Sequence, residues 1–258
     1  MAVFVSADWV EERLDSPDVQ ILDPRRPVKY LQGHIRNAVN LPVAKAFSSE
    51  GELLADEALQ RWLGAAGLGG GKTPIVYDAY DGQSGAMLAW ILEYLGCTDV
   101  HLMDVFFEKW VAEGRGVFYR PVTPKASEFK ARVNPQVRTT AREILTQRGL
   151  KLVDFRSREE YAGQQDTDGR PGHLPGAVHI DWRDLLGEGH RILAPEEKLR
   201  RLFAAVGVSP GDEVVAYCRI GMRAAIGYLV LQQLGYHVRL YDGSHAQWAR
   251  SGLPVEEP

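Results

Sequence analysis

The sequence predicts an α/β protein built from two tandem domains, each a mainly parallel sheet covered by helices on both faces. Short apolar runs alternate with amphipathic segments along the chain, which is the pattern of strands joined by crossover helices. The second half of the 258-residue chain also repeats motifs of the first. With 45% hydrophobic residues, a chain of this length can bury two ordinary cores.

The repeat consists of four short motifs that occur in both halves in the same order. The pairs are 19–25 with 150–156, 30–40 with 172–179, 74–78 with 214–218, and 94–97 with 233–236. Between the halves lies a proline-punctuated stretch, typical of a linker. We therefore predict an N-terminal domain over 1–118, a linker over 119–137 and a C-terminal domain over 138–258.

Each half is expected to alternate strands and helices. In the first half the helices are predicted at 7–14, 56–66 and 84–95, with a short one ending at Trp110, and the strands at 21–22, 74–77 and 100–102. Ser6 is a candidate N-cap of the first helix. In the second half, Thr140 and Glu143 form a capping-box pattern, a helix is predicted over 223–234, and a strand over 238–241.

The stretch 214–225 delivers one cysteine from an apolar strand to the start of a helix. Unpaired N–H groups at a helix N-terminus and the cations Arg219 and Arg223 would favour a Cys218 thiolate over the thiol. A lone cysteine after a strand can also be a buried packing residue. Arginine, however, is costly to bury without an anion, and Gly221 lets backbone amides turn inward. We therefore predict Cys218 as the catalytic nucleophile.

The rest of the loop is predicted to bind the substrate. These residues are Arg219, Ile220, Gly221, Met222 and Arg223.

Composition excludes several classes of protein. The net charge is −4 and no Lys/Arg-rich stripe occurs, so neither nucleic acid nor an anionic membrane is an expected partner. No signal peptide and no apolar run of membrane-spanning length is visible. The two cysteines, Cys97 and Cys218, suit a reducing cytoplasm and lack zinc-site spacing. We expect a cytoplasmic monomer with no metal and no cofactor.

The duplication separates residues that the fold demands from residues that carry chemistry. Both halves share an Asp-x-Arg pair, Asp23 with Arg25 and Asp154 with Arg156, which we interpret as charge clamps at strand ends. His34 and His173 are also shared, and we expect them to be hydrogen-bonded scaffold residues rather than bases or metal ligands. Trp110 and Trp248 close the two halves similarly.

The nucleophile is not shared. Allowing one extra residue in the first loop, Asp78 takes the place of Cys218, and Asp81 adds a second acid where the second loop has arginines. Carboxylates repel an anion, so a loop that carries two of them is not suited to bind an anionic substrate. The first half is therefore predicted to be catalytically inactive. Cys97 is expected to be an inert packing residue. The glycine-rich segment 66–73 fits a loose P-loop pattern, but it lies between a helix and a strand and is interpreted as a turn.

The loop from Cys218 to Arg223, following an apolar strand, resembles the active-site loop of the rhodaneses, the thiosulfate sulfurtransferases. Tandem rhodaneses share the two-domain architecture, and their inactive N-terminal domain carries Asp at the position of Asp78. Three residues depart from the family pattern. Animal thiosulfate rhodaneses have Lys where this chain has Ile220, many tandem members have a substrate-binding Arg in place of Glu160, and the aromatic residue of the closing Gly-Ser motif is replaced by His245.

The resemblance implies a double displacement, in which the sulfane sulfur of thiosulfate passes through a Cys218 persulfide to cyanide, a thiol or a protein acceptor. Cysteine phosphatases place five residues between Cys and Arg, whereas four lie between Cys218 and Arg223, one too few for phosphate. The two arginines favour dianionic thiosulfate. The alternatives are a 3-mercaptopyruvate sulfurtransferase and a persulfide carrier that docks to a partner. The insertion 163–171, absent from the first half, is either a docking loop or a solvated loop.

Overall fold

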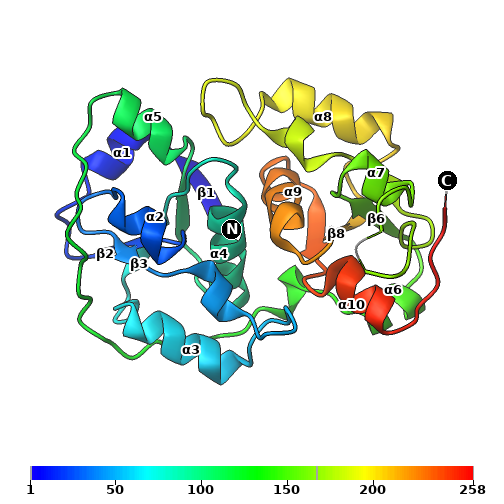
Figure 1. Ribbon diagram of the computed structural model, residues 1–258, viewed down its shortest axis with the longest axis horizontal. Helices are drawn as coiled ribbons and strands as arrows, with labels where there is room; N and C mark the ends of the chain where they lie inside the picture. Colours follow the sequence, from blue (N-terminus) through cyan, green and yellow to red (C-terminus); the bar gives the residue numbers. More distant parts are fainter. Residues whose placement is uncertain (1, 167, 258) are drawn as a thin grey trace. The chain divides into compact units, whose positions relative to one another are not determined.

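The computed structural model describes residues 2–166 and 168–257, and its chain divides into two compact units (Figure 1). One contains the residues up to Asn134 together with Glu188–Ile192, and the other contains Pro135–Gly187 together with the residues from Leu193 onward. Residues 119–134 form neither helix nor strand. The residue-level bounds of the domains stay a prediction, while the α/β class of both units is confirmed.

The first unit holds a five-stranded sheet in the order β1-β5-β4-β2-β3, in which all the paired strands are parallel. Its strands are β1 (Ala2–Val5), β2 (Val19–Asp23), β3 (Val39–Asn40), β4 (Thr73–Val76) and β5 (Val100–Met103). Its helices are α1 (Ala7–Glu11), α2 (Pro27–Leu31), η1 (Val43–Ala46), α3 (Asp56–Ala65), α4 (Gln83–Tyr94) and α5 (Phe107–Ala112). The edge strands β1 and β3 and the short helices α2 and η1 were not among the predicted elements.

The second unit repeats this plan with a four-stranded parallel sheet in the order β7-β6-β8-β9. Its strands are β6 (Leu150–Asp154), β7 (Val178–His179), β8 (Glu213–Tyr217) and β9 (His237–Leu240). Its helices are η2 (Pro135–Val137), α6 (Ala141–Thr146), α7 (Arg158–Tyr161), η3 (Trp182–Leu185), α8 (Glu196–Ala205), α9 (Met222–Gln233) and α10 (Ser244–Arg250). The order of strands and helices therefore follows the duplication.

The local signals at helix starts are confirmed. Ser6 accepts a hydrogen bond from Trp9 N, and Thr140 forms a reciprocal capping box with Glu143. The first helix is shorter than predicted, ending at Glu11 rather than 14. Beyond it, Leu14 N bonds to Glu11 O three residues back, so the α-helix gives way to tighter turns.

The shared Asp-x-Arg pairs are confirmed as buried charge clamps. Arg25 donates to Asp23 at 2.6 Å and to Gly33 O at 2.8 Å. In the second unit, Arg156 donates to Asp154 and to Gly172 O, each at 2.7 Å. Each guanidinium thus ties the end of a strand to the connection that leads to the next strand.

The shared histidines make the hydrogen-bonded packing contacts expected of scaffold residues, and the shared tryptophans occupy similar places in the two units. His34 and His173 stack on tyrosine rings, with centroids 3.9 and 3.8 Å apart, and their Nδ1 atoms contact the carbonyl oxygens of the same tyrosines. Trp110 donates to Gly116 O and Trp248 to Pro254 O. These interactions hold the periphery of each unit around its sheet.

Candidate active site

The sheet of the second unit delivers Cys218 directly to the start of α9. Strand β8 pairs with β6 on one side and β9 on the other, and Cys218 is the residue that follows it. Gly221 caps α9 with a φ of +85°, a left-handed conformation that glycine adopts without steric penalty. The predicted strand, cysteine loop and helix are therefore confirmed, with α9 beginning at Met222.

Three hydrogen bonds from the start of α10 hold the loop. Cys218 N donates to Ser244 Oγ at 3.2 Å, His245 N donates to Cys218 O at 3.0 Å, and Ala246 N donates to Arg219 O at 2.9 Å. Ser244 has a φ of +53°, an uncommon conformation for a serine, and its hydroxyl in turn donates to Tyr241 O. Contacts from a segment about 26 residues further along the chain thus fix the backbone beside the thiol.

The amides of the same loop are left without partners. Within residues 2–166 and 168–257, nothing accepts a hydrogen bond from the backbone N–H groups of residues 219–223. Unpaired amides at a turn and at a helix N-terminus carry partial positive charge, and such an arrangement binds anions. The loop can therefore hold a negatively charged sulfur species on Cys218 through its backbone.

The corresponding loop of the first unit is occupied by its own carboxyl groups. Asp78 accepts hydrogen bonds from Ala79 N at 2.8 Å and from Gly85 N at 2.6 Å, and Glu108 accepts from Tyr80 N at 3.2 Å. Burial raises the pKa of Asp78 to about 7, against the pull of these amides. This loop has an aspartate where the other has the cysteine, and carboxylates accept hydrogen bonds from several of its amides, so it differs from the Cys218 loop in both respects.

Both arginines of the Cys218 loop are paired with carboxylates. Arg219 donates to Asp168 Oδ1 from Nε at 3.0 Å, and its Nη2 lies 2.8 Å from the same oxygen. Arg223 forms a bidentate pair with Glu160, at 2.5 and 2.9 Å. The sequence-based expectation left both guanidinium groups free for a bound anion, but in the structure each already has a protein counter-ion. The physical reason is that a guanidinium withdrawn from water requires an anion.

Glu160 is ionised despite its burial. Burial favours the protonated acid, but hydrogen bonds from Arg223 and from Ser157 N outweigh it and lower the pKa of Glu160 to about 2. Conversely, burial opposes the charge on Arg223, but the Glu160 carboxylate and the nearby Cys218 raise its pKa above the ordinary value. Glu160 stands where many tandem rhodaneses have an arginine, and in this structure it pairs with Arg223 of the Cys218 loop.

Asp168 comes from the insertion 163–171 and contacts two parts of the site. Its Oδ2 lies 3.2 Å from His245 Nδ1, and its side chain is only 8% exposed. Burial and the charge of Arg156 lower the pKa of His245, against the attraction of Asp168. Sequence reasoning treated the insertion as a docking or solvated loop and missed Asp168. Its presence in a segment that the first half lacks was the available signal. Thr167 lies outside the described residues.

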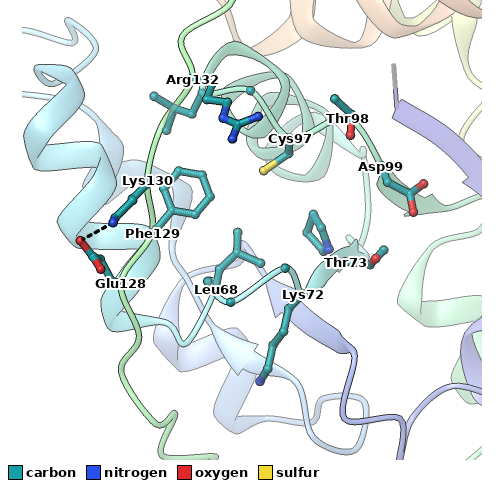
Figure 2. A pocket seen from close by; sticks show the side chains of 16 residues that line it. Leu68, Lys72, Thr73, Cys97, Thr98, Asp99, Glu128, Phe129, Lys130 and Arg132 are labelled. Atoms are coloured by element: carbon teal, nitrogen blue, oxygen red, sulfur yellow. Dashed lines mark ion pairs between the residues drawn. The ribbon is translucent and has the colours of Figure 1, made fainter.

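Cys97 lies in a different setting, on a pocket of about 450 Å³ in the first unit (Figure 2). The glycine-rich turn that precedes β4 lines one side of this pocket, which confirms its interpretation as a turn. Burial raises the pKa of the Cys97 thiol to about 11. Because the thiolate is the reactive form, Cys97 is a poor nucleophile near neutral pH.

Among the described residues, no cluster of three or more His, Cys, Asp or Glu side chains is arranged to hold a metal ion. No helix in that part of the chain combines the length and the apolar character needed to cross a membrane.

The fold and the loop define a class: an α/β domain that carries a cysteine just before a helix, in a loop whose amides are unpaired among the described residues, in a chain whose other half repeats the fold without that cysteine. The chain belongs to the rhodanese-like domain family, whose profile matches residues 6–113 and 138–251. It is 32% identical over 274 residues to a thiosulfate sulfurtransferase of Corynebacterium glutamicum, covering 98% of this chain and 89% of the relative. It is also 30% identical over 280 residues to the sulfur carrier protein TtuD of Thermus thermophilus, covering 98% and 96%.

Among solved structures, the chain is similar to the anaerobic ergothioneine biosynthesis enzyme of Chlorobium limicola in complex with trimethyl histidine. The TM-score is 0.87 at 22% identity, covering 98% of this chain and 70% of the other. A likeness at this level of identity extends to the fold alone.

Proposed function

We propose that the protein is a sulfurtransferase that carries the transferred sulfur as a persulfide on Cys218. The main observation behind this proposal is that the amides of residues 219–223, which follow Cys218, are unpaired among the described residues. Cys218 also stands where the loop of the first unit has Asp78. The family membership and the names of relatives of similar length support the same chemistry.

The reaction consists of two displacements. With thiosulfate as donor, the Cys218 thiolate attacks the outer sulfur, a new S–S bond forms, and sulfite leaves with the electron pair of the broken S–S bond. An acceptor thiolate or cyanide then attacks the outer sulfur of the persulfide and releases the Cys218 thiolate. The loop amides are suited to stabilise the negative charge on the cysteine-bound sulfur at both stages. Thiosulfate is proposed as one donor that this chemistry accepts, because a relative that spans the chain carries that name.

A second candidate is a sulfur carrier, which passes the persulfide to a protein acceptor without rapid turnover of free thiosulfate. The observation that favours it is the pairing of both loop arginines, which leaves no guanidinium in the described loop reserved for a free dianion. TtuD of Thermus thermophilus, named as a sulfur carrier, aligns with nearly the whole chain.

The decisive experiment measures intact mass after exposure to thiosulfate, with and without a thiol acceptor. We expect Cys218 to gain one sulfur atom and to lose it when the acceptor is added. Cys97→Ser is the matched control and should load normally, whereas Cys218→Ser should not load. Sulfur on the Cys218→Ser protein would contradict the proposal. Rapid unloading by a small thiol supports the enzyme, and a persulfide that only a protein acceptor discharges supports the carrier.

A further inference from the structure

The two arginines beside Cys218 are each neutralised by a carboxylate. Arg219 and Arg223 contribute two positive charges, and Asp168 and Glu160 contribute two negative ones. The side chains of Asp168 and Glu160 are 8% and 7% exposed, so water screens these carboxylates poorly. A donor that approaches the loop therefore meets four charges whose sum is zero, rather than a doubly positive site.

With the arginine charges neutralised, the backbone N–H groups of the loop are the main groups left to bind an anion in this site. The amides of residues 219–223 have no acceptor among the described residues, and they suit one negatively charged sulfur atom. A dianion gains less, because the charge of each guanidinium is already balanced by a carboxylate that would also repel the incoming anion. Displacing Glu160 from Arg223 would leave a buried, ionised carboxylate without its main partner, which is strongly unfavourable.

We infer that Glu160 and Asp168 are specificity-determining residues that restrict the site to sulfane-sulfur donors of low charge, with organic hydropersulfides as the preferred class and thiosulfate bound weakly. This inference rests on the proposed persulfide chemistry. In the corresponding step, the Cys218 thiolate attacks the terminal sulfur of R–S–SH, a new S–S bond forms, and the thiolate R–S⁻ leaves with the electron pair. The proton of the donor remains on the transferred sulfur or is lost to solvent.

The role of the insertion follows from this inference. Asp168 links it to Arg219 and His245, and Arg170 fastens it to Leu253 O at 3.2 Å. Its function is to bring a carboxylate to the Cys218 loop. Glu160 performs the same task for Arg223 from the N-terminal turn of α7, where its carboxylate also accepts from Ser157 N at 3.0 Å.

The test compares donors in the full-length protein. Glu160→Gln and Asp168→Asn each remove a charge while keeping an oxygen that can accept a hydrogen bond. Steady-state kinetics would be measured with thiosulfate, a dianion, and with cysteine hydropersulfide, whose reacting –S–SH group is uncharged. We expect each variant to raise kcat/KM for thiosulfate about tenfold, mainly through a lower KM, because one guanidinium becomes available to the dianion. The value for cysteine hydropersulfide should change less than about threefold, because that donor depends on the amides.

The matched control is Glu196→Gln, which removes an exposed carboxylate paired with Arg200 on α8. Glu196→Gln should leave kcat/KM unchanged for both donors. If it raised kcat/KM for thiosulfate as much as Glu160→Gln or Asp168→Asn, the gain would come from the overall charge of the protein, and the inference would be overturned. Arg219→Met combined with Asp168→Asn should lose the gain of Asp168→Asn alone. Thermal unfolding would identify a variant that fails to fold, in which case the other carboxylate variant provides the test.

The outcomes separate the inference from the proposed function. Failure of every donor to load sulfur on Cys218 would remove the proposed function itself. If Cys218 loads normally but the carboxylate variants change kcat/KM for both donors by the same factor, only the roles of Glu160 and Asp168 are overturned. The same holds if these variants selectively lower kcat/KM for thiosulfate.

Discussion

Arg223→Met probes whether the main partner of this arginine is Glu160. The substitution keeps an apolar stem of similar length but removes the guanidinium, leaving the Glu160 carboxylate buried at 7% exposure without its bidentate partner. The pKa of Glu160 lies at about 2 rather than 4.5, a difference that corresponds to about 3 kcal/mol of stabilisation above pH 4.5. We therefore expect Arg223→Met to lower the free energy of unfolding at pH 7 by about 3 kcal/mol, within the range for a broken buried pair.

The assay is urea unfolding of the wild type, Arg223→Met, and the double variant Arg223→Met with Glu160→Gln. The double variant should lose only about 1 kcal/mol, because neither charge remains unpaired. The pH dependence has a definite sign. A depressed carboxyl pKa stabilises the folded state above the unfolded value of 4.5, and this contribution is lost as the pH falls through about 2. The difference in the free energy of unfolding between wild type and Arg223→Met should therefore become smaller below pH 4.5.

Two results would refute this reasoning. A loss smaller than about 0.5 kcal/mol in Arg223→Met would place its effect in the range of an ordinary surface substitution. A double variant as unstable as the single one would show that the cost arises from lost packing rather than from an unpaired charge.

Three further outcomes are expected. Gly227→Ala should destabilise by about 2 kcal/mol in urea unfolding, since its Cβ would lie 2.3 Å from the buried Phe155 ring and this clash outweighs the usual helix gain; a stabilised variant would contradict it. Burial raises the pKa of Asp78 to about 7 from 3.8, so stability should fall as the pH rises from about 4 to 7, and Asp78→Asn should flatten that slope; an unchanged slope would exclude Asp78 as its source. With a pKa of about 11, Cys97 should react with iodoacetamide slowly at pH 7 and faster as the pH approaches 11, as peptide mass spectrometry would show; rapid reaction at pH 7 would rule out a buried thiol.

The sequence by itself determined the duplication, the α/β alternation of the longer strands and helices, and the position of the cysteine. These features depend on local signals. A strand, a tight turn with Gly221 and an apolar helix follow one another within residues 213–233, and the comparison of Cys218 with Asp78 needs only the repeat. The caps at Ser6 and Thr140 were predictable for the same reason, because a cap depends on residues three positions apart.

Tertiary structure decided the partners of the charges. Arg219 meets Asp168 across 51 residues of sequence and Arg223 meets Glu160 across 63, so the sequence showed two arginines beside a thiol but not their neutralisation. The edge strand β1 escaped prediction for a related reason, because its register partner is β5, with Ala2 opposite Val100. Pairings at such separations are fixed by which elements the folded sheet places side by side, and no local pattern encodes them. The charge of the site is therefore a property of the fold, and the donor preference that we infer depends on it.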